Sequence, residues 1–360
     1  MNKIYGIQYL RAFAALSVVA LHAGKRVEAD LPGPLYDVLL LGHGGVDLFF
    51  VISGFIMVYT TAQSWPGTGN FLLNRVIRIV PLYWLMTLAV FALAMIAPSL
   101  LGSTEARPEY LAKSLAFIPF EKSNGRMEPI LFLGWTLNYE MFFYLILGLG
   151  LAWKARGLAA VALFFVALVA AGLIAAGSAG EFSDPLLRFY THPILLEFVI
   201  GMAIGAAYLH PGWDALWSRS SPWIGAAMVA GGLAALVFLP LVELPTDRIV
   251  QIGLASACIV FGALWLERLG HVVRSNTVLL LGNASYAIYL THPFVTQAVS
   301  KVADMLSLNS VLVRCLLVPV TYALVMLAGV IVHLMLEKPM TRAIRAAMGV
   351  RRKSAPAGGM

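Results

Sequence analysis

Long apolar segments recur along the whole chain and constrain its fold more than any other feature. Each is about long enough to cross a hydrocarbon core of roughly 30 Å. The ten segments cover about residues 7–24, 43–62, 79–97, 132–153, 158–177, 191–209, 222–240, 249–266, 278–299 and 311–335. Because a chain in lipid must satisfy its backbone hydrogen bonds internally, these segments predict an all-α integral membrane protein. We expect a bundle of about ten transmembrane helices.

The composition agrees with a membrane protein that crosses the bilayer many times. Of the 360 residues, 60% are hydrophobic and 12% are charged, and the mean hydropathy is +0.83. These values exclude an ordinary soluble domain. The even spacing of the segments predicts one membrane domain over residues 1–340, followed by a basic, disordered tail at 341–360. The first apolar run contains charged and titratable residues and no clear cleavage site follows it, so it is not a typical signal peptide.

The placement of Lys and Arg predicts the topology. Positive charge gathers on the cytoplasmic side of membrane proteins, and the loops around Arg75, Arg78, Lys154 and Arg156 are basic. This pattern places the N-terminus in the cytoplasm, and an even number of helices then places the C-terminus there too. The tail sequence RAIRAAMGVRRK is typical of an anchor on anionic lipid. The pI near 9.4 therefore reflects cytoplasmic anchoring rather than nucleic-acid binding.

Arg11 and His22 lie inside the first apolar segment, YGIQYLRAFAALSVVALHAG. They are eleven positions apart, so on a helix they face nearly the same side, roughly 16 Å apart along the axis. A charge in hydrocarbon costs several kcal/mol unless it faces the protein interior or a water-filled cavity. The pair therefore predicts a polar site inside the bundle that handles both an anion and a proton.

The second and third segments add polar groups to this predicted site. Asp47 enters its apolar run within about one turn, and Ser53 and Gly54 interrupt the same run. Small residues allow helices to pack closely, which is the simpler interpretation of Ser53 and Gly54. Arg75 and Arg78 share a helix face, and a pair of forked guanidinium groups suits phosphate recognition. Their alternative role is ordinary anchoring at the cytoplasmic surface.

Two more carboxylates lie in apolar runs. Glu140 follows Trp135 about two turns into the fourth segment, and a carboxylate at that depth needs a cation or a proton. Trp135 also fits the common role of an interface anchor. Glu197 lies in the sixth segment, where we expect it to pair with an arginine. Gly201, four residues further on, indicates close helix packing.

The ninth and tenth segments carry hydroxyl groups and imidazoles. Tyr286, Tyr289 and His292 lie on or near one helical face, although the sequence His-Pro could simply end the helix. His333 and Glu337 are four residues apart at the end of the tenth segment, and we interpret them as a structural pair.

Several common catalytic motifs are absent from the sequence. It contains no HExxH, CxxC, Walker loop or GxSxG. Cys258 and Cys315 lie in apolar runs and give neither a disulfide framework nor metal-ligand spacing. The buried charges fit a membrane enzyme or, as an alternative, a proton-coupled secondary transporter. No clear internal repeat supports the transporter.

Six motifs together resemble one family. They are RAFAAL followed by His22, GGVDLFFVISGF, NRVIRIVPLYW, WTLNYEMFFYL, LLEFVIGM and SYAIYLTHP, in this order. They resemble the acyltransferase-3 family of membrane acyltransferases, which includes O-acetyltransferases of bacterial O-antigen, exopolysaccharide and Nod factor. The resemblance covers almost the whole chain and is greatest to the compact exopolysaccharide-type members. The usual WSLSxE motif reads WTLNYE here, so Thr136 and Asn138 replace serines with other hydrogen-bonding side chains.

The resemblance implies a membrane O-acyltransferase in the inner membrane. It implies an acyl-CoA donor from the cytoplasm, most often acetyl-CoA, and no metal. The acceptor would be a hydroxyl of a cell-surface or exported glycan or of a lipid-linked oligosaccharide. Nucleic acid is not an expected partner.

The resemblance also selects the site residues. His22 is the expected general base, because the pKa of an unperturbed imidazole is near neutral. Either Asp47 or Glu140 would orient it, and the sequence does not decide between them. We favour direct transfer because neither cysteine lies among polar residues, with an acyl-His22 intermediate as the alternative. The expected CoA-binding residues are Arg11, Arg75 and Arg78, and the expected cavity residues are Ser53, Trp135, Tyr286, Tyr289 and His292.

Overall fold

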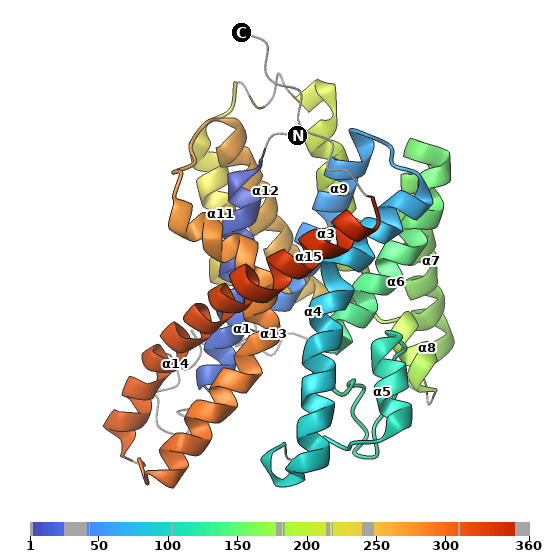
Figure 1. The fold of residues 1–360 in the computed structure, drawn as a ribbon. Helices are drawn as coiled ribbons and strands as arrows, with labels where there is room; N and C mark the ends of the chain where they lie inside the picture. Colours follow the sequence, from blue (N-terminus) through green and yellow to red (C-terminus); the bar gives the residue numbers. More distant parts are fainter. Residues whose placement is uncertain are drawn as a thin grey trace.

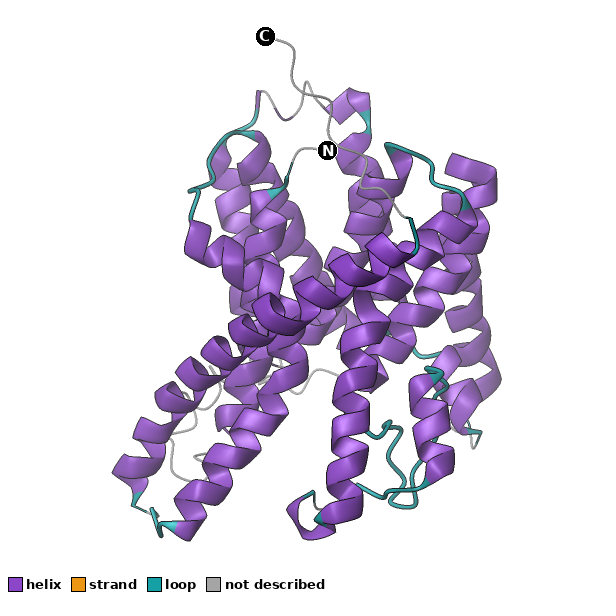
Figure 2. Ribbon diagram, viewed as in Figure 1, coloured by secondary structure: helices purple, strands orange, loops and turns teal. Residues whose placement is uncertain are grey.

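The computed structural model is helical throughout the part of the chain it describes. That part comprises residues 3–24, 42, 44–101, 104–177, 182, 184–213, 217, 219–239, 248–308 and 310–349, and it contains no strand. The longer helices are α1 (Tyr5–Gly24), α3 (Gly44–Ala62), α4 (Thr68–Ile96), α6 (Gly134–Gly150), α7 (Lys154–Ala176), α9 (Leu195–Leu209), α11 (Pro222–Phe238), α12 (Leu254–Arg268), α13 (Asn276–Met305) and α14 (Val311–Val332). Figure 2 shows this all-helical composition.

Short helices connect and extend the long ones. They are α5 (Pro108–Leu115), α8 (Pro185–Tyr190) and α15 (Lys338–Ala347). Single turns of 3₁₀-helix occur at Pro98–Leu100, Leu151–Trp153 and Pro211–Trp213. Two π-helices, Ile249–Gly253 and His333–Glu337, lead directly into α12 and α15. Such π turns are rare and often lie at functional sites.

The protein is an integral membrane protein, as its hydropathy predicted. Seven helical segments of the described chain are long and apolar enough to cross a bilayer: Tyr5–Gly24, Gly44–Ala62, Thr68–Ile96, Gly134–Ala176, Pro185–Leu209, Asn276–Met305 and Val311–Ala347. One of them, Gly134–Ala176, contains both α6 and α7, which fold back on each other. Each of the ten predicted segments overlaps one long helix. The count of ten crossings and the cytoplasmic placement of both termini stay predictions.

Helices α1 and α3 form the middle of the bundle (Figure 1). Helix α1 packs on α3 and α13, and α3 packs on α9. The pair α13 and α14 leans away on one side, and α6 to α9 lie together on the other. Helix α15 crosses the front of the molecule from the end of α14 to α4. The central position of α1 explains how its polar residues avoid lipid.

Two glycines allow α3 and α9 to pack backbone against backbone. A Cβ atom added at Gly54 would collide with the carbonyl oxygen of Phe198, and one at Gly201 with that of Val51. Small residues at such contacts let membrane helices approach closely. The interpretation of Gly54 and Gly201 as packing residues is therefore confirmed.

We expect Gly201→Ala to destabilise the protein by roughly 1–3 kcal/mol, the usual cost of overpacking a tight core. The colliding atom belongs to the backbone of α3, so no side-chain rotation relieves it. Gly231→Ala on α11 is the matched control, because a Cβ there has nothing within 4 Å. Thermal unfolding of the purified proteins in detergent measures the difference. Equal unfolding temperatures for Gly201→Ala and wild type would contradict the packing argument.

Two local predictions need correction. The His-Pro sequence does not end a helix, because α13 continues through Pro293 to Met305. The basic tail expected to be disordered from residue 341 is helical through Ala347, and residues 350–360 lie outside the described part. Helix α15 exists because Ala, Met and Arg favour helix and its apolar and basic residues lie on different faces.

Candidate active site

The polar residues of the membrane helices surround two neighbouring cavities. The larger, which we call the arginine cavity, has a volume of about 820 Å³ and is lined by Arg11, Arg75 and Arg78. The smaller, the histidine cavity, has a volume of about 410 Å³ and is lined by His22. Val46 and Tyr289 line both cavities, so these two side chains belong to the wall between them.

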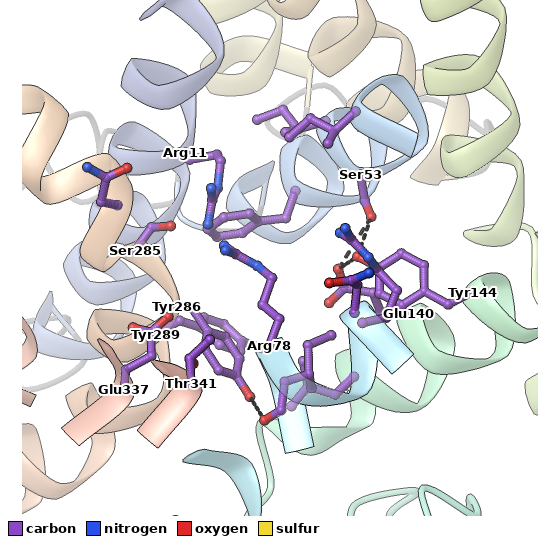
Figure 3. Close-up of a pocket in the computed structure, with 18 of the residues that line it drawn as sticks. Arg11, Ser53, Arg78, Glu140, Tyr144, Ser285, Tyr286, Tyr289, Glu337 and Thr341 are labelled. Atoms are coloured by element: carbon purple, nitrogen blue, oxygen red, sulfur yellow. Dashed lines mark hydrogen bonds between the residues drawn. The ribbon is translucent and has the colours of Figure 1, made fainter. Parts of the chain in front are cut away.

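Arginines from two helices converge in the arginine cavity. Arg11 comes from α1, and Arg75 and Arg78 come from α4. Figure 3 shows the guanidinium groups of Arg11 and Arg78 pointing toward one another. None of the three forms an ion pair within 4 Å with a carboxylate of the described residues. Cations that face one another in this way form a binding site for an anion.

Glu140 lies on another wall of the arginine cavity. Its carboxylate accepts hydrogen bonds from the hydroxyl groups of Ser53, at 3.3 Å, and Tyr144 (Figure 3). The guanidinium carbon of Arg75 lies 5.7 Å from the centre of the Tyr144 ring and 5.6 Å from that of Phe71. By accepting the hydrogen bond from Tyr144, Glu140 holds the Tyr144 ring in its place beside the Arg75 guanidinium group.

Tyrosines on α13 connect the cavity wall to other helices. The Tyr286 hydroxyl donates to the carbonyl oxygen of Ile79 on α4, at 2.8 Å. The Tyr289 and Thr136 hydroxyl oxygens are 3.0 Å apart, and each lies within hydrogen-bond distance of the Leu133 carbonyl. Thr136, which replaces a serine of the motif, thus uses its hydroxyl to hold the wall between the cavities.

His22 has a defined tautomer. Its Nδ1 lies 2.9 Å from the carbonyl oxygen of Val18, one turn earlier in α1. A carbonyl only accepts, so Nδ1 carries a proton, and in the neutral imidazole Nε2 is then the basic nitrogen. A neutral imidazole with this tautomer can act as a base toward a group in the histidine cavity.

A second imidazole lies beside His22. The ring centres of His22 and His292 are 4.9 Å apart, and His292 is fully buried. Pro293 has no N–H to donate to the Tyr289 carbonyl, which is the partner that position would have in an α-helix. The Nδ1 of His292 donates to that carbonyl instead, at 2.7 Å, so in the neutral ring the proton lies on Nδ1 and not on Nε2. No described group hydrogen-bonds to this Nε2.

Asp47 is held by Arg248, which its sequence position did not mark as a site residue. Arg248 donates from Nε to Oδ1, at 3.0 Å, and from a terminal nitrogen to Oδ2, at 2.6 Å. Asp47 is fully buried, and Arg248 also lines the histidine cavity. Glu197, expected to pair with an arginine, is buried near this pair and has no ion pair of its own among the described residues. Arg248 was missed because an arginine at the edge of an apolar segment usually indicates an anchor.

We expect Asp47→Ala to destabilise the protein by about 3 kcal/mol, at the lower end of the range for breaking a buried ion pair. The lower end applies because the Arg248 side chain is 40% exposed. Glu109→Ala removes an exposed ion pair with Lys113 on α5, and solvent screening of such a pair means that stability should hardly change. Denaturant unfolding in detergent compares the two. An Asp47→Ala variant as stable as the Glu109→Ala variant would show that the buried pair contributes nothing.

The loop after α5 forms part of the wall of the histidine cavity. Lys122 is buried there, and its ammonium group lies 3.7 Å from the carboxylate of Glu128. Burial lowers the pKa of Lys122, and the nearby carboxylate opposes part of this change. Trp135, expected in the cavity, also lines it.

The structure brings most of the predicted residues together, but it divides them between the two cavities. Neither Asp47 nor Glu140 is hydrogen-bonded to His22 in the part of the chain that the structure describes. Glu140 lines the arginine cavity, and the imidazole of His292 lies tilted beside that of His22. His333 and Glu337 form the expected pair, with 2.7 Å between nitrogen and oxygen, and both line the arginine cavity.

Comparison with known proteins identifies the class. A family model described as "Acyltransferase domain" (Acyl_transf_3) matches residues 4–335, so the chain belongs to this family of acyltransferases. The resemblance inferred from the six motifs is therefore confirmed. Together with the membrane-spanning helices, it makes the protein a membrane acyltransferase.

Three relatives illustrate the range of the family. The exopolysaccharide production protein ExoZ of Rhizobium meliloti (strain 1021) is 36% identical over 316 residues, covering 85% of this chain and 92% of its own. The acyltransferase MdmB of Streptomyces mycarofaciens is 26% identical, covering 79% and 76%. Nodulation protein 10 of Rhizobium leguminosarum bv. viciae is 27% identical, covering 79% and 81%. No solved structure matches the chain.

Proposed function

We propose that the protein is an inner-membrane O-acyltransferase that moves an acyl group, most simply acetyl, from CoA to a hydroxyl of an exported glycan. The main support is the pair of cavities with a shared wall, one lined by arginines and the other by His22. An anionic donor and a hydroxyl acceptor can thus approach the wall from opposite sides. The similarity to an exopolysaccharide production protein favours a glycan as acceptor.

The donor enters the arginine cavity from the cytoplasm in this proposal. The three arginines bind phosphate groups of CoA, since forked guanidinium groups match phosphate oxygens. About 16 Å of helix axis separate Arg11 from His22, so an extended arm such as the pantetheine of CoA can carry the thioester toward the wall at Tyr289. Ser53, Tyr286 and Tyr289 line the path of that arm.

His22 activates the acceptor. Its Nε2 takes the proton of the sugar hydroxyl while the hydroxyl oxygen attacks the thioester carbonyl carbon. The tetrahedral intermediate then collapses: the carbon–sulfur bond breaks, and the CoA sulfur takes the proton from the imidazolium. The products are the acylated glycan and CoA, and His22 returns to its neutral form.

We propose that transfer is direct and that the two carboxylates position other groups. Cys258 and Cys315 lie on α12 and α14, and neither is among the residues lining the two cavities. Asp47 positions Arg248 at the histidine cavity, and Glu140 positions Arg75 through Tyr144. His292 supports His22 from its buried side.

The test is an acyl-transfer assay with purified protein in nanodiscs. It contains radiolabelled acetyl-CoA and a membrane glycolipid extract from the host, with a His22→Ala protein in parallel. We expect label in the glycan fraction with wild type and not with the variant. Absence of both CoA binding and transfer with wild type would refute the proposed donor and reaction.

A further inference from the structure

Helix α15 completes the arginine cavity with a second group of cations. Lys338, Arg342 and Arg345 all line this cavity. Their spacing of four and three residues places them on one face of the helix. From the sequence, the stretch that begins at Arg342 is interpreted as a lipid anchor, so the place of α15 in the cavity comes from the tertiary structure alone.

A polar row leads from α14 onto this face. His333, Glu337, Thr341 and Arg345 follow at intervals of four residues, and all four line the cavity. The row passes through the π-helix His333–Glu337, just before Pro339. Proline lacks an N–H and disturbs regular α-helix, which a π turn accommodates. Figure 1 shows α15 crossing from α14 to α4, over the bundle.

The distribution of charge on α15 argues against lipid as the main partner. The helix has three charged residues, and all of them face the cavity. Its exposed residues away from the cavity include Pro339, Ala343 and Ala346, which carry no charge. A helix that bound lipid headgroups would present its basic residues outward, toward the membrane surface.

The cavity as a whole carries far more positive than negative charge. Seven basic residues line it, against the two carboxylates of Glu140 and Glu337. Six of them form two groups, one on the membrane helices α1 and α4 and one on α15, and the seventh, Lys3, lies just before α1. CoA likewise carries two separate phosphate groups, a diphosphate next to the pantetheine arm and a 3′-phosphate on the ribose.

We propose that the basic face of α15 binds the 3′-phosphate of the CoA donor. This inference rests on the proposed function, and it deepens it. The arm must point toward Tyr289, so the diphosphate next to it belongs with Arg11, Arg75 and Arg78. Their helices contact the helices that carry the wall residues: α1 packs on α3 and α13, and α4 packs on α13. The 3′-phosphate then reaches Lys338, Arg342 and Arg345. The tail helix thereby selects CoA over carriers that lack the 3′-phosphate.

Binding of two probes tests the proposal. CoA and dephospho-CoA differ by the 3′-phosphate alone, and their dissociation constants are measured by calorimetry in phosphatidylcholine nanodiscs, which present no net charge. We expect wild type to bind CoA about 30-fold more tightly than dephospho-CoA, because charge-assisted contacts to one phosphate are worth about one to two factors of ten. The triple variant Lys338→Ala, Arg342→Ala, Arg345→Ala should bind both probes with equal affinity.

The control variant removes basic residues that do not line the cavity. Lys154 and Arg156 are exposed at the start of α7 and are not among the residues lining the cavity. Lys154→Ala with Arg156→Ala should keep the 30-fold preference. Retained binding of dephospho-CoA by the triple variant shows that it is folded.

Three outcomes would overturn the proposal. If the triple variant kept the preference for CoA, α15 would not bind the 3′-phosphate. If the variant differed from wild type only in nanodiscs containing phosphatidylglycerol, α15 would be a lipid anchor. If wild type bound neither probe, the CoA donor itself would be wrong, and the failure would lie in the proposed function.

Discussion

Replacing His22 with alanine is expected to lower the rate of acyl transfer by about 10²–10⁴-fold, the usual contribution of a positioned general base. The dissociation constant for CoA should change by less than about twofold, because our proposal places the CoA phosphates in the arginine cavity rather than beside His22. The Nδ1 of His22 lies on the Val18 carbonyl, so in the proposed mechanism Nε2 is the atom that accepts the sugar proton. Single-turnover transfer of labelled acetyl-CoA measures the rate, and equilibrium binding measures the affinity.

Two further variants sharpen this test. His22→Gln keeps a polar side chain but has no basic nitrogen, so its rate should fall as far as that of His22→Ala. His271→Ala removes an exposed histidine and should transfer at the wild-type rate. Near-normal transfer by His22→Ala would exclude His22 as the base. Label trapped on Cys258 or Cys315 would refute direct transfer.

Arg75→Ala combined with Arg78→Ala is expected to weaken CoA binding by about 10²–10⁴-fold. Each arginine makes charge-assisted contacts to phosphate worth about 1.5–3 kcal/mol, and 1.4 kcal/mol corresponds to a factor of ten. Arg75→Lys with Arg78→Lys keeps the charge but loses the forked geometry. The affinity of this variant for CoA should therefore lie between those of wild type and the double alanine variant. Equilibrium binding of labelled CoA in nanodiscs measures all three proteins.

The control for this prediction removes the same charge elsewhere. Arg107→Ala with Arg188→Ala changes two arginines near α5 and α8, where they contact Tyr110 and Glu121. CoA affinity should not change in that variant. If the Arg75 and Arg78 double variant bound CoA normally but inserted poorly into membranes, the two arginines would serve as topological anchors only.

The sequence was sufficient to predict the helices but not which side chains of different helices contact one another. Hydropathy located the helices, since the cost of burying polar groups in lipid acts on each segment separately. Local spacing also placed Arg11 and His22 on one face of α1 and paired His333 with Glu337. Backbone effects were harder to predict: the sequence His-Pro suggested a helix end, whereas the His292 side chain satisfies the carbonyl that Pro293 leaves without a donor.

The tertiary structure alone decided which groups meet across helices. Asp47 was a candidate partner of His22, but it pairs with Arg248, 201 positions away in the sequence. Glu140 pairs with Ser53 and Tyr144 and belongs to the arginine cavity rather than to the histidine. The basic tail sequence predicts a lipid anchor, whereas in the structure the basic residues of α15 line the arginine cavity. Hydropathy and helical periodicity are local properties that one segment carries by itself, so the sequence determined that this chain is a helical membrane protein with an arginine and a histidine on its first helix. A contact between side chains on different helices depends on how those helices pack, and packing decided which polar residues face each cavity, which pair with one another, and which lie beside His22.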